Sequence, residues 1–134
     1  MGSEMCIRDS LKVLLAEDNL INQKLAVRIL EKQGWKATVA NNGREAVEWV
    51  EKNGFDFVLM DVQMPEMDGL EATKEIREKE KITGKHIPIV ALTAHAFKED
   101  EEKCLSAGMD GYTTKPIKIQ ELFKIIEDIL KEKL

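Results

Sequence analysis

The sequence of 134 residues predicts an α/β fold in which helices cover both faces of a five-stranded, doubly wound parallel sheet. Two observations support this fold class. From residue 11 onward, short apolar runs alternate strictly with longer amphipathic segments, as repeated strand–helix units require. The first, third and fourth runs are almost continuously apolar, which is typical of strands buried on both sides. We therefore expect one domain over residues 11–134.

The predicted strands are short runs of mostly apolar residues. They cover residues 11–16, 36–40, 55–60, 87–93 and 111–114. The first, third and fourth are the most apolar, so we place them at the centre of the sheet.

The predicted helices follow the strands, and each carries residues at helical spacing. Their stripes are Ile21, Leu25 and Ile29; Ala46, Val47 and Val50; Leu70, Thr73 and Ile76; Phe97, Glu101, Cys104 and Leu105; and Leu122, Ile125, Ile126, Ile129 and Leu130. We expect the first and fifth helices to pack on one face of the sheet and the other three on the opposite face.

Local signals mark several helix ends. Asn42 and Asp68, each with a glutamate three residues later, fit capping boxes that begin the second and third helices. Gly34 and Gly108 come just after stripe ends, where a residue in the left-handed conformation often terminates a helix.

Composition and charge disfavour several classes of protein. A net charge of −5 argues against a nucleic-acid-binding surface, and no apolar run approaches the ~18 residues of a membrane span. Cys6 and Cys104 lack metal-ligand spacing and suit a reduced, cytoplasmic protein. We expect no nucleic-acid partner and no direct membrane contact. Residues 1–10 have no periodicity and no signal-peptide core. We interpret them as a non-native or disordered leader, such as a tag or the read-through of a sequencing adapter.

Polar residues gather where the predicted strands end. Glu17 and Asp18 follow the first strand, Asp61 follows the third, Thr93 ends the fourth and Lys115 follows the fifth. In doubly wound sheets, ligands bind at the carboxyl ends of the strands, near the point where the strand order reverses. Three carboxylates at this edge repel one another, and a divalent cation relieves the repulsion. Hard oxygen ligands without a His or Cys cluster favour Mg²⁺.

This set of groups suits phosphoryl transfer. A carboxylate that attacks a phosphoryl group approaches an anionic centre, so catalysis depends on positioning and on neutralising the equatorial oxygens. Asp61 is the expected nucleophile, which becomes an acyl phosphate. Mg²⁺, Lys115 and the Thr93 hydroxyl are expected to stabilise the phosphoryl oxygens.

Four segments, LLAEDN, LMDVQMPEMDG, ALTAHA and GYTTKPI, occur in this order at the ends of the predicted strands. Together they resemble the receiver domain of two-component response regulators, and most closely the receivers of hybrid sensor histidine kinases. The resemblance runs from about Leu11 to the C-terminus. It implies a flavodoxin-like (βα)5 fold with strand order 2-1-3-4-5.

The resemblance implies a role for each polar residue at the sheet edge. Asp61 matches the phosphoacceptor, Lys115 the phosphate-binding lysine and Thr93 the switch hydroxyl. Asp18 and Asp61 are implied as Mg²⁺ ligands, and Glu17 is implied to bind the ion through water.

Further positions carry roles by the same resemblance. The main-chain carbonyl of Gln63 is implied as a metal ligand, and Lys115 with Pro116 as a cis peptide. Tyr112 matches the aromatic switch position. Gln63 and His95 match positions that vary in the family and tune the lifetime of the phosphate.

The expected function is that of a phosphoacceptor in a two-component phosphorelay, not of an enzyme with turnover as its purpose. The expected partner is a histidine phosphotransfer domain or the dimerisation domain of a histidine kinase, docked on the first helix near Ile21 and Leu25. We expect a monomer or weak dimer, in the cytoplasm by itself or as part of a membrane-anchored sensor kinase.

Other functions share parts of this pattern. A Mg²⁺-dependent aspartyl-phosphate phosphohydrolase of the haloacid-dehalogenase type needs an acid two residues after its nucleophile, where Gln63 stands. A flavin carrier needs a phosphate-binding loop after the first strand, and the acidic AEDNLINQ segment would repel the phosphate. A receiver-like interaction module that no longer accepts phosphate remains an alternative.

Overall fold

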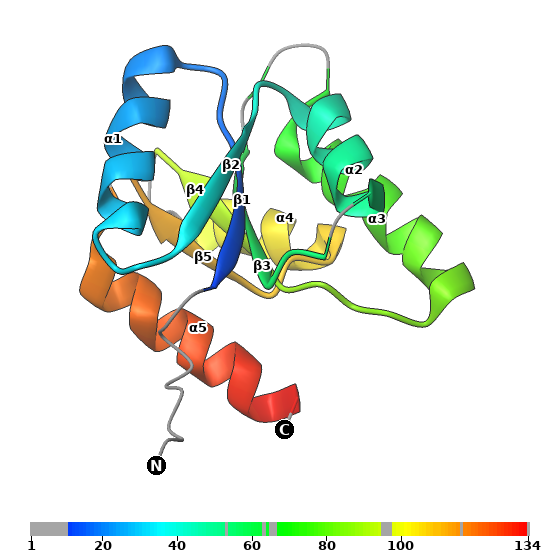
Figure 1. The fold of residues 1–134 in the computed structure, drawn as a ribbon. Helices are drawn as coiled ribbons and strands as arrows, with labels where there is room; N and C mark the ends of the chain where they lie inside the picture. Colours follow the sequence, from blue (N-terminus) through cyan, green and yellow to red (C-terminus); the bar gives the residue numbers. More distant parts are fainter. Residues whose placement is uncertain are drawn as a thin grey trace.

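The structure, a computed structural model, describes residues 11–52, 54–62, 64, 67–94, 98–115 and 117–133. The elements are β1 (Lys12–Ala16), α1 (Leu20–Glu31), β2 (Lys36–Ala40), α2 (Gly43–Lys52), β3 (Phe57–Asp61), α3 (Gly69–Thr83), β4 (Ile89–Thr93), α4 (Lys98–Ala107), β5 (Gly111–Thr114) and α5 (Ile119–Lys133). The strands form one parallel sheet in the order β2-β1-β3-β4-β5 (Figure 1). The predicted fold class and strand order are confirmed. The predicted leader, residues 1–10, lies outside the described residues.

Helices cover the two faces of the sheet unequally. In Figure 1, α1 and α5 lie on one face, and α2, α3 and α4 lie on the other. We call these the α1/α5 face and the α2–α4 face. This is the arrangement predicted from the sequence. Because both faces are covered, β3 and β4 are buried along their whole length, as expected of central parallel strands.

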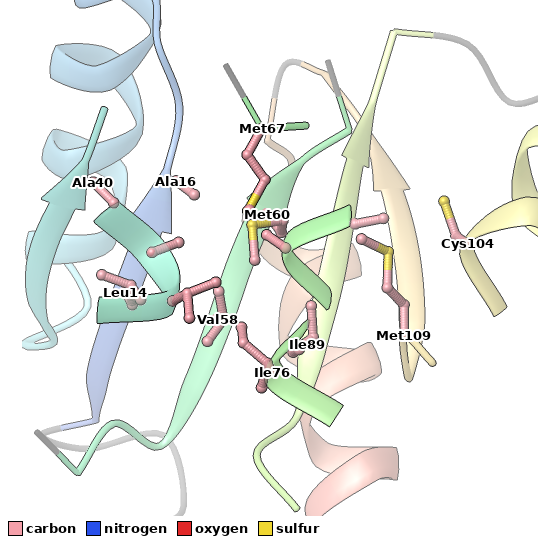
Figure 2. Packing of buried hydrophobic residues seen from close by; sticks show 14 residues of the cluster. Leu14, Ala16, Ala40, Val58, Met60, Met67, Ile76, Ile89, Cys104 and Met109 are labelled. Atoms are coloured by element: carbon pink, nitrogen blue, oxygen red, sulfur yellow. The ribbon is translucent and has the colours of Figure 1, made fainter. Parts of the chain in front are cut away.

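Side chains of each strand alternate between two separate hydrophobic cores. On the α2–α4 face, Leu14, Val58 and Met60 pack in one core with Ile76 of α3 (Figure 2). Figure 2 also shows Ile89, Met109 and Cys104 extending this core toward α4. On the α1/α5 face, the second core contains Val13, Leu15, Phe57, Leu59, Val90, Leu92, Leu30, Leu122 and Ile126. The alternation fixes which side each polar residue at the strand ends can reach.

The predicted helix caps are largely confirmed. The Asn42 side chain accepts a hydrogen bond from the Glu45 N–H at 2.9 Å, and Asp68 accepts one from the Glu71 N–H at 2.9 Å. Gly108 has φ +107 directly after α4, where the Met109 N–H bonds back to the carbonyl of Cys104, the pattern of a Schellman ending. Gly34 also has positive φ, although the α1 cap is already reached at Lys32.

The apolar stripe predicted for the first helix does not face the core. Ile21 is 76% exposed and Leu25 is 48% exposed. The buried positions of α1 are instead Gln23, Ala26 and Leu30, which share a face at three- and four-residue spacing. Spacing alone identified the helix, but Ile21 and Leu25 lie on a surface that is open to a partner.

Among the described residues, no helix has the length and hydrophobicity needed to cross a membrane.

One buried hydroxyl yields a stability prediction. Thr113 of β5 is 4% exposed, and its hydroxyl has no hydrogen-bond partner among the described residues. Replacing it with the isosteric valine removes an unsatisfied polar group, so Thr113→Val should raise the free energy of unfolding by about 1 kcal/mol. Thr73→Val is the matched control, because the buried Thr73 hydroxyl donates to the Gly69 carbonyl at 2.8 Å. Urea unfolding should show opposite signs for the two variants.

Candidate functional site

The register of β1 and β3 places two carboxylates side by side at the sheet edge. Ala16 lies opposite Met60, so the residues that follow them, Glu17 and Asp61, are neighbours. Leu15 and Leu59, two residues earlier, point into the core on the α1/α5 face. Side chains alternate along a strand, so both carboxylates leave the sheet toward that same face. Asp61 is itself the last residue of β3, although the predicted strand ended one residue before it.

Lys115 neutralises both carboxylates. Its Nζ lies 2.7 Å from Asp61 Oδ2 and 3.0 Å from Glu17 Oε1. Glu17 is 2% exposed and Asp61 is 4% exposed. Without this ammonium, two nearly buried negative charges would lie next to each other and repel. Burial by itself would lower the pKa of Lys115, but hydrogen bonds to Asp61 and Glu17 and their charges outweigh burial and raise that pKa. The side chain is therefore a cation at neutral pH.

A third carboxylate completes a candidate metal site. Glu17, Asp18 and Asp61 each offer one oxygen, and these oxygens lie within 4.8 Å of one another. Opposite ligands of an octahedral Mg²⁺ are about 4 Å apart, and this ion usually keeps several waters. The all-oxygen donor set, with Asp18 exposed to solvent and Glu17 and Asp61 buried, fits that chemistry. Glu17, Asp18 and Asp61 are therefore the described residues that could hold a magnesium ion.

Thr93 and Tyr112 lie on the opposite face of the sheet from the carboxylates. In the β4–β5 register, Ala91 pairs with Tyr112 and Thr93 with Thr114. Ala91 belongs to the core on the α2–α4 face, and alternation places Thr93 and Tyr112 on that side as diagonal neighbours. The nearby charge of Glu101 in α4, burial and a hydrogen bond to Glu101 raise the pKa of the Tyr112 hydroxyl. Tyr112 is thus linked to α4.

The described part of the chain contains most of the predicted site residues, but not all of them. Glu17, Asp18, Asp61, Thr93 and Lys115 lie at the carboxyl ends of their strands, and Tyr112 is the second residue of β5. Gln63, His95 and Pro116 lie outside the described residues. The carbonyl ligand, the two tuning positions and the cis peptide therefore stay predictions.

Two supports of the site were missed from the sequence. A Cβ on Gly69 would lie 2.3 Å from the carbonyl oxygen of Asp61, so only glycine lets α3 begin this close to the end of β3. The other is Gln23, whose buried amide donates to the carbonyl of Glu17. Its position on one helix face with Ala26 and Leu30 was the available signal.

Comparison with known proteins agrees with this geometry. The family described as Response regulator receiver domain matches residues 13–127. The chain belongs to this family. Receiver domains in known proteins include that of hybrid signal transduction histidine kinase I from Dictyostelium discoideum, which is 48% identical over 130 residues. The resemblance found in the sequence is confirmed.

The relatives differ in how much of them this receiver domain spans. The match covers 93% of the chain but 7% of the Dictyostelium kinase. The polar-differentiation response regulator DivK of Brucella anthropi is 36% identical over 118 residues, covering 88% of the chain and 94% of DivK. The chain therefore spans only a small part of the hybrid kinases it matches.

Solved receiver structures have the same fold. One neighbour comes from the co-crystal structure of the Saccharomyces cerevisiae histidine phosphotransfer protein Ypd1 with the receiver domain of Ssk1. It is 36% identical with a TM-score of 0.82, covering 90% of this chain and 89% of that one. Another is the receiver domain of sensor histidine kinase PA1611 from Pseudomonas aeruginosa, with a magnesium ion in its active-site cleft. It is 41% identical with a TM-score of 0.79, covering 89% and 96% of the two chains.

Removing the positive charge of Lys115 should leave the repulsion between the Glu17 and Asp61 carboxylates uncompensated. Lys115→Met should lower the free energy of unfolding in EDTA by about 1–3 kcal/mol, because two nearly buried carboxylates lose their partner. Saturating Mg²⁺ should recover part of this loss. Urea unfolding with EDTA and with Mg²⁺ measures both effects.

Lys118→Met is the matched control, because Lys118 lies outside the site and forms an exposed pair with Glu121 at 3.7 Å. It should change stability little under either condition. A Lys115→Met protein as stable in EDTA as the unmodified protein would contradict the electrostatic account of this site.

Proposed function

We propose that this receiver domain accepts a phosphoryl group from a partner phosphohistidine onto Asp61, in a Mg²⁺-dependent step of a phosphorelay. The observation that supports this best is the Asp61 carboxylate at the end of a buried central strand, hydrogen-bonded to Lys115 and grouped with Glu17 and Asp18. The domain acts once per phosphoryl group as an acceptor, so turnover is not its purpose.

The transfer is a displacement at phosphorus. A carboxylate oxygen of Asp61 forms a bond to phosphorus while the P–N bond to the donor imidazole breaks, and its electron pair stays on that nitrogen. Lys115, whose Nζ lies beside Asp61, would bind an equatorial phosphoryl oxygen as negative charge develops there. Bound Mg²⁺ would supply further neutralisation of the phosphoryl oxygens. Glu17, Asp18 and Asp61 would hold it, with the main chain of Gln63.

Thr93 and Tyr112 are suited to report the phosphorylation. The Thr93 side chain is 5% exposed at the end of β4, the strand beside Asp61. Its movement toward the phosphoryl group would vacate space next to Tyr112 on the α2–α4 face. Tyr112 would then turn inward and leave Glu101, which changes the surface shared by α4 and β5. Phosphorylation would thereby shift the population of two conformations.

The exposed apolar side chains of α1 favour a protein partner. Leu20 is 62% exposed, and with Ile21 and Leu25 it forms an apolar patch close to the carboxylates. A groove lined by Leu25 also contains Glu17 and Lys115, so the patch adjoins the acceptor site. A histidine phosphotransfer domain or a kinase dimerisation domain seated there could present its phosphohistidine to Asp61. We propose that residues 11–134 form the receiver domain of such a relay.

Acetyl phosphate tests the acceptor role directly. In the presence of Mg²⁺ the protein should gain the mass of one phosphoryl group, and Asp61→Asn should gain none, because it loses the nucleophilic oxygen. Asp128→Asn in α5 is the control and should behave like the unmodified protein, since Asp128 is exposed and remote in sequence from the site. Intact-mass spectrometry with Mg²⁺ and with EDTA measures the gain.

The same reaction with acetyl phosphate, followed by an assay for inorganic phosphate and a Mg²⁺ titration, separates the alternatives. Continuous release of inorganic phosphate with many turnovers would instead indicate a phosphohydrolase. Failure to bind Mg²⁺ together with no mass gain would indicate a phosphorylation-incompetent interaction module.

The docking patch has a separate test. Ile21→Ser should slow phosphoryl transfer from a phosphorylated histidine phosphotransfer protein such as Ypd1 by about tenfold at subsaturating concentrations, as expected for loss of an apolar contact. Its rate with acetyl phosphate should not change. Ile82→Ser is the matched control, because Ile82 is 88% exposed at the end of α3. Equal transfer rates for the two variants would contradict docking on α1.

A further inference from the structure

Gln23 is a polar residue on the buried face of α1. It is 8% exposed and lies at helical spacing from Ala26 and Leu30, which face the core. Burying an amide is costly unless it is hydrogen-bonded. Its Nε2 donates to the main-chain carbonyl of Glu17 at 2.5 Å and to Asn41 Oδ1 at 2.9 Å. Both partner atoms are acceptors, so the orientation of the amide follows from chemistry.

Asn41 is itself held in place. Its main-chain N–H and its side-chain amide both donate to Glu45 Oε1, at 2.9 and 3.2 Å. This leaves its Oδ1 as the acceptor for Gln23. A chain of hydrogen bonds therefore runs from the first turn of α2, through the end of β2 and α1, to the carbonyl that follows β1.

The carbonyl that Gln23 binds belongs to the peptide joining Glu17 to Asp18. A peptide unit is planar, so fixing its oxygen fixes the rotation of the whole plane. The Glu17 N–H donates to the Ala40 carbonyl at 3.0 Å, and the Glu17 carboxylate accepts from the Asn19 N–H at 3.2 Å. The N–H, the carbonyl and the carboxylate of Glu17 are thus all hydrogen-bonded. The direction in which the exposed Asp18 side chain leaves the chain depends on that one peptide plane.

We propose that Gln23 is a positioning residue for the metal site. It sets the plane of the Glu17–Asp18 peptide and so aims the Asp18 carboxylate at the position shared with Glu17 and Asp61, without touching the ion. The inference rests on the proposed use of Mg²⁺. Residues that orient metal ligands in this indirect way typically change metal affinity by 10- to 100-fold when replaced.

Gln23→Met tests the proposal because methionine keeps the length and fills the buried space but cannot donate. Its Kd for Mg²⁺, measured by isothermal titration calorimetry, should rise about tenfold, the low end of such effects. Gln33→Met should leave the Kd unchanged, because Gln33 lies after the end of α1, ten residues beyond Gln23 in the sequence. Urea unfolding in EDTA measures the stability of each variant without metal, which distinguishes a purely structural role of Gln23 from a role in metal binding. A stability loss with an unchanged Kd would overturn the proposal.

Asn41→Ala provides a second variant, since Asn41 is exposed and its loss leaves the core intact. It removes one of the two acceptors that hold the Gln23 amide, so the Kd should rise less than in Gln23→Met. The double variant should bind no more weakly than Gln23→Met alone, because the two residues act through one chain of bonds. If Gln23→Met does not fold, an unchanged Kd in Asn41→Ala overturns the proposal.

The failures are distinguishable. An unmodified protein that binds no Mg²⁺ overturns the proposed function and this inference with it. An unmodified protein that binds Mg²⁺ and gains a phosphoryl group, with variants of unchanged Kd, overturns this inference alone.

Discussion

The alternation of side chains along parallel strands that are covered on both faces is the constraint on which this structure depends. It sends Glu17, Asp61 and Lys115 to the α1/α5 face. The same rule sends Thr93 and Tyr112 to the α2–α4 face. The residues that would receive a phosphoryl group and those that would report it are therefore separated by the thickness of one sheet. Asp61 and Thr93 nevertheless remain close, at the ends of the neighbouring strands β3 and β4.

The positive charge of Lys115 compensates the two nearly buried carboxylates of the receiver site. Glu17 and Asp61 tolerate near burial because Lys115 lies within 3.0 Å of both. The lysine is 27% exposed at its side chain and is anchored by the Lys115 N–H bond to the Thr93 carbonyl at 2.8 Å. An ammonium on a flexible stem can follow negative charge over a short distance. In the proposed reaction the same cation stabilises the resting carboxylates and then part of the added negative charge of the phosphoryl group.

Much of this arrangement could be predicted from the sequence, because its signals are local. Apolar runs marked the strands, and Asn42 and Asp68 marked helix starts. The features that were not predicted depend on contacts between residues that are distant in the sequence. The buried face of α1 includes Gln23, whose partner Asn41 is 18 residues away. The need for glycine at position 69 arises from the approach of the Asp61 carbonyl. The spacing of Gln23, Ala26 and Leu30 marks one face of α1, but neither the hydrogen-bond partner of Gln23 nor the close approach at Gly69 can be identified before the elements are placed in space.

The amino ends of the strands are secured differently from the carboxyl ends. Arg77 of α3 donates to the carbonyls of Gly108 and Ile87 and pairs with Glu80 and Asp110, at 2.6 to 2.9 Å. These bonds join the C-terminal half of α3, the segment before β4 and the connection from α4 to β5. Because the segment after α4 is held at Gly108 and Asp110, we expect a rearrangement at Thr93 to be accommodated mainly at the carboxyl edge of the sheet. We therefore expect the proposed switch to be confined to the end of the sheet where the phosphoryl group would be bound.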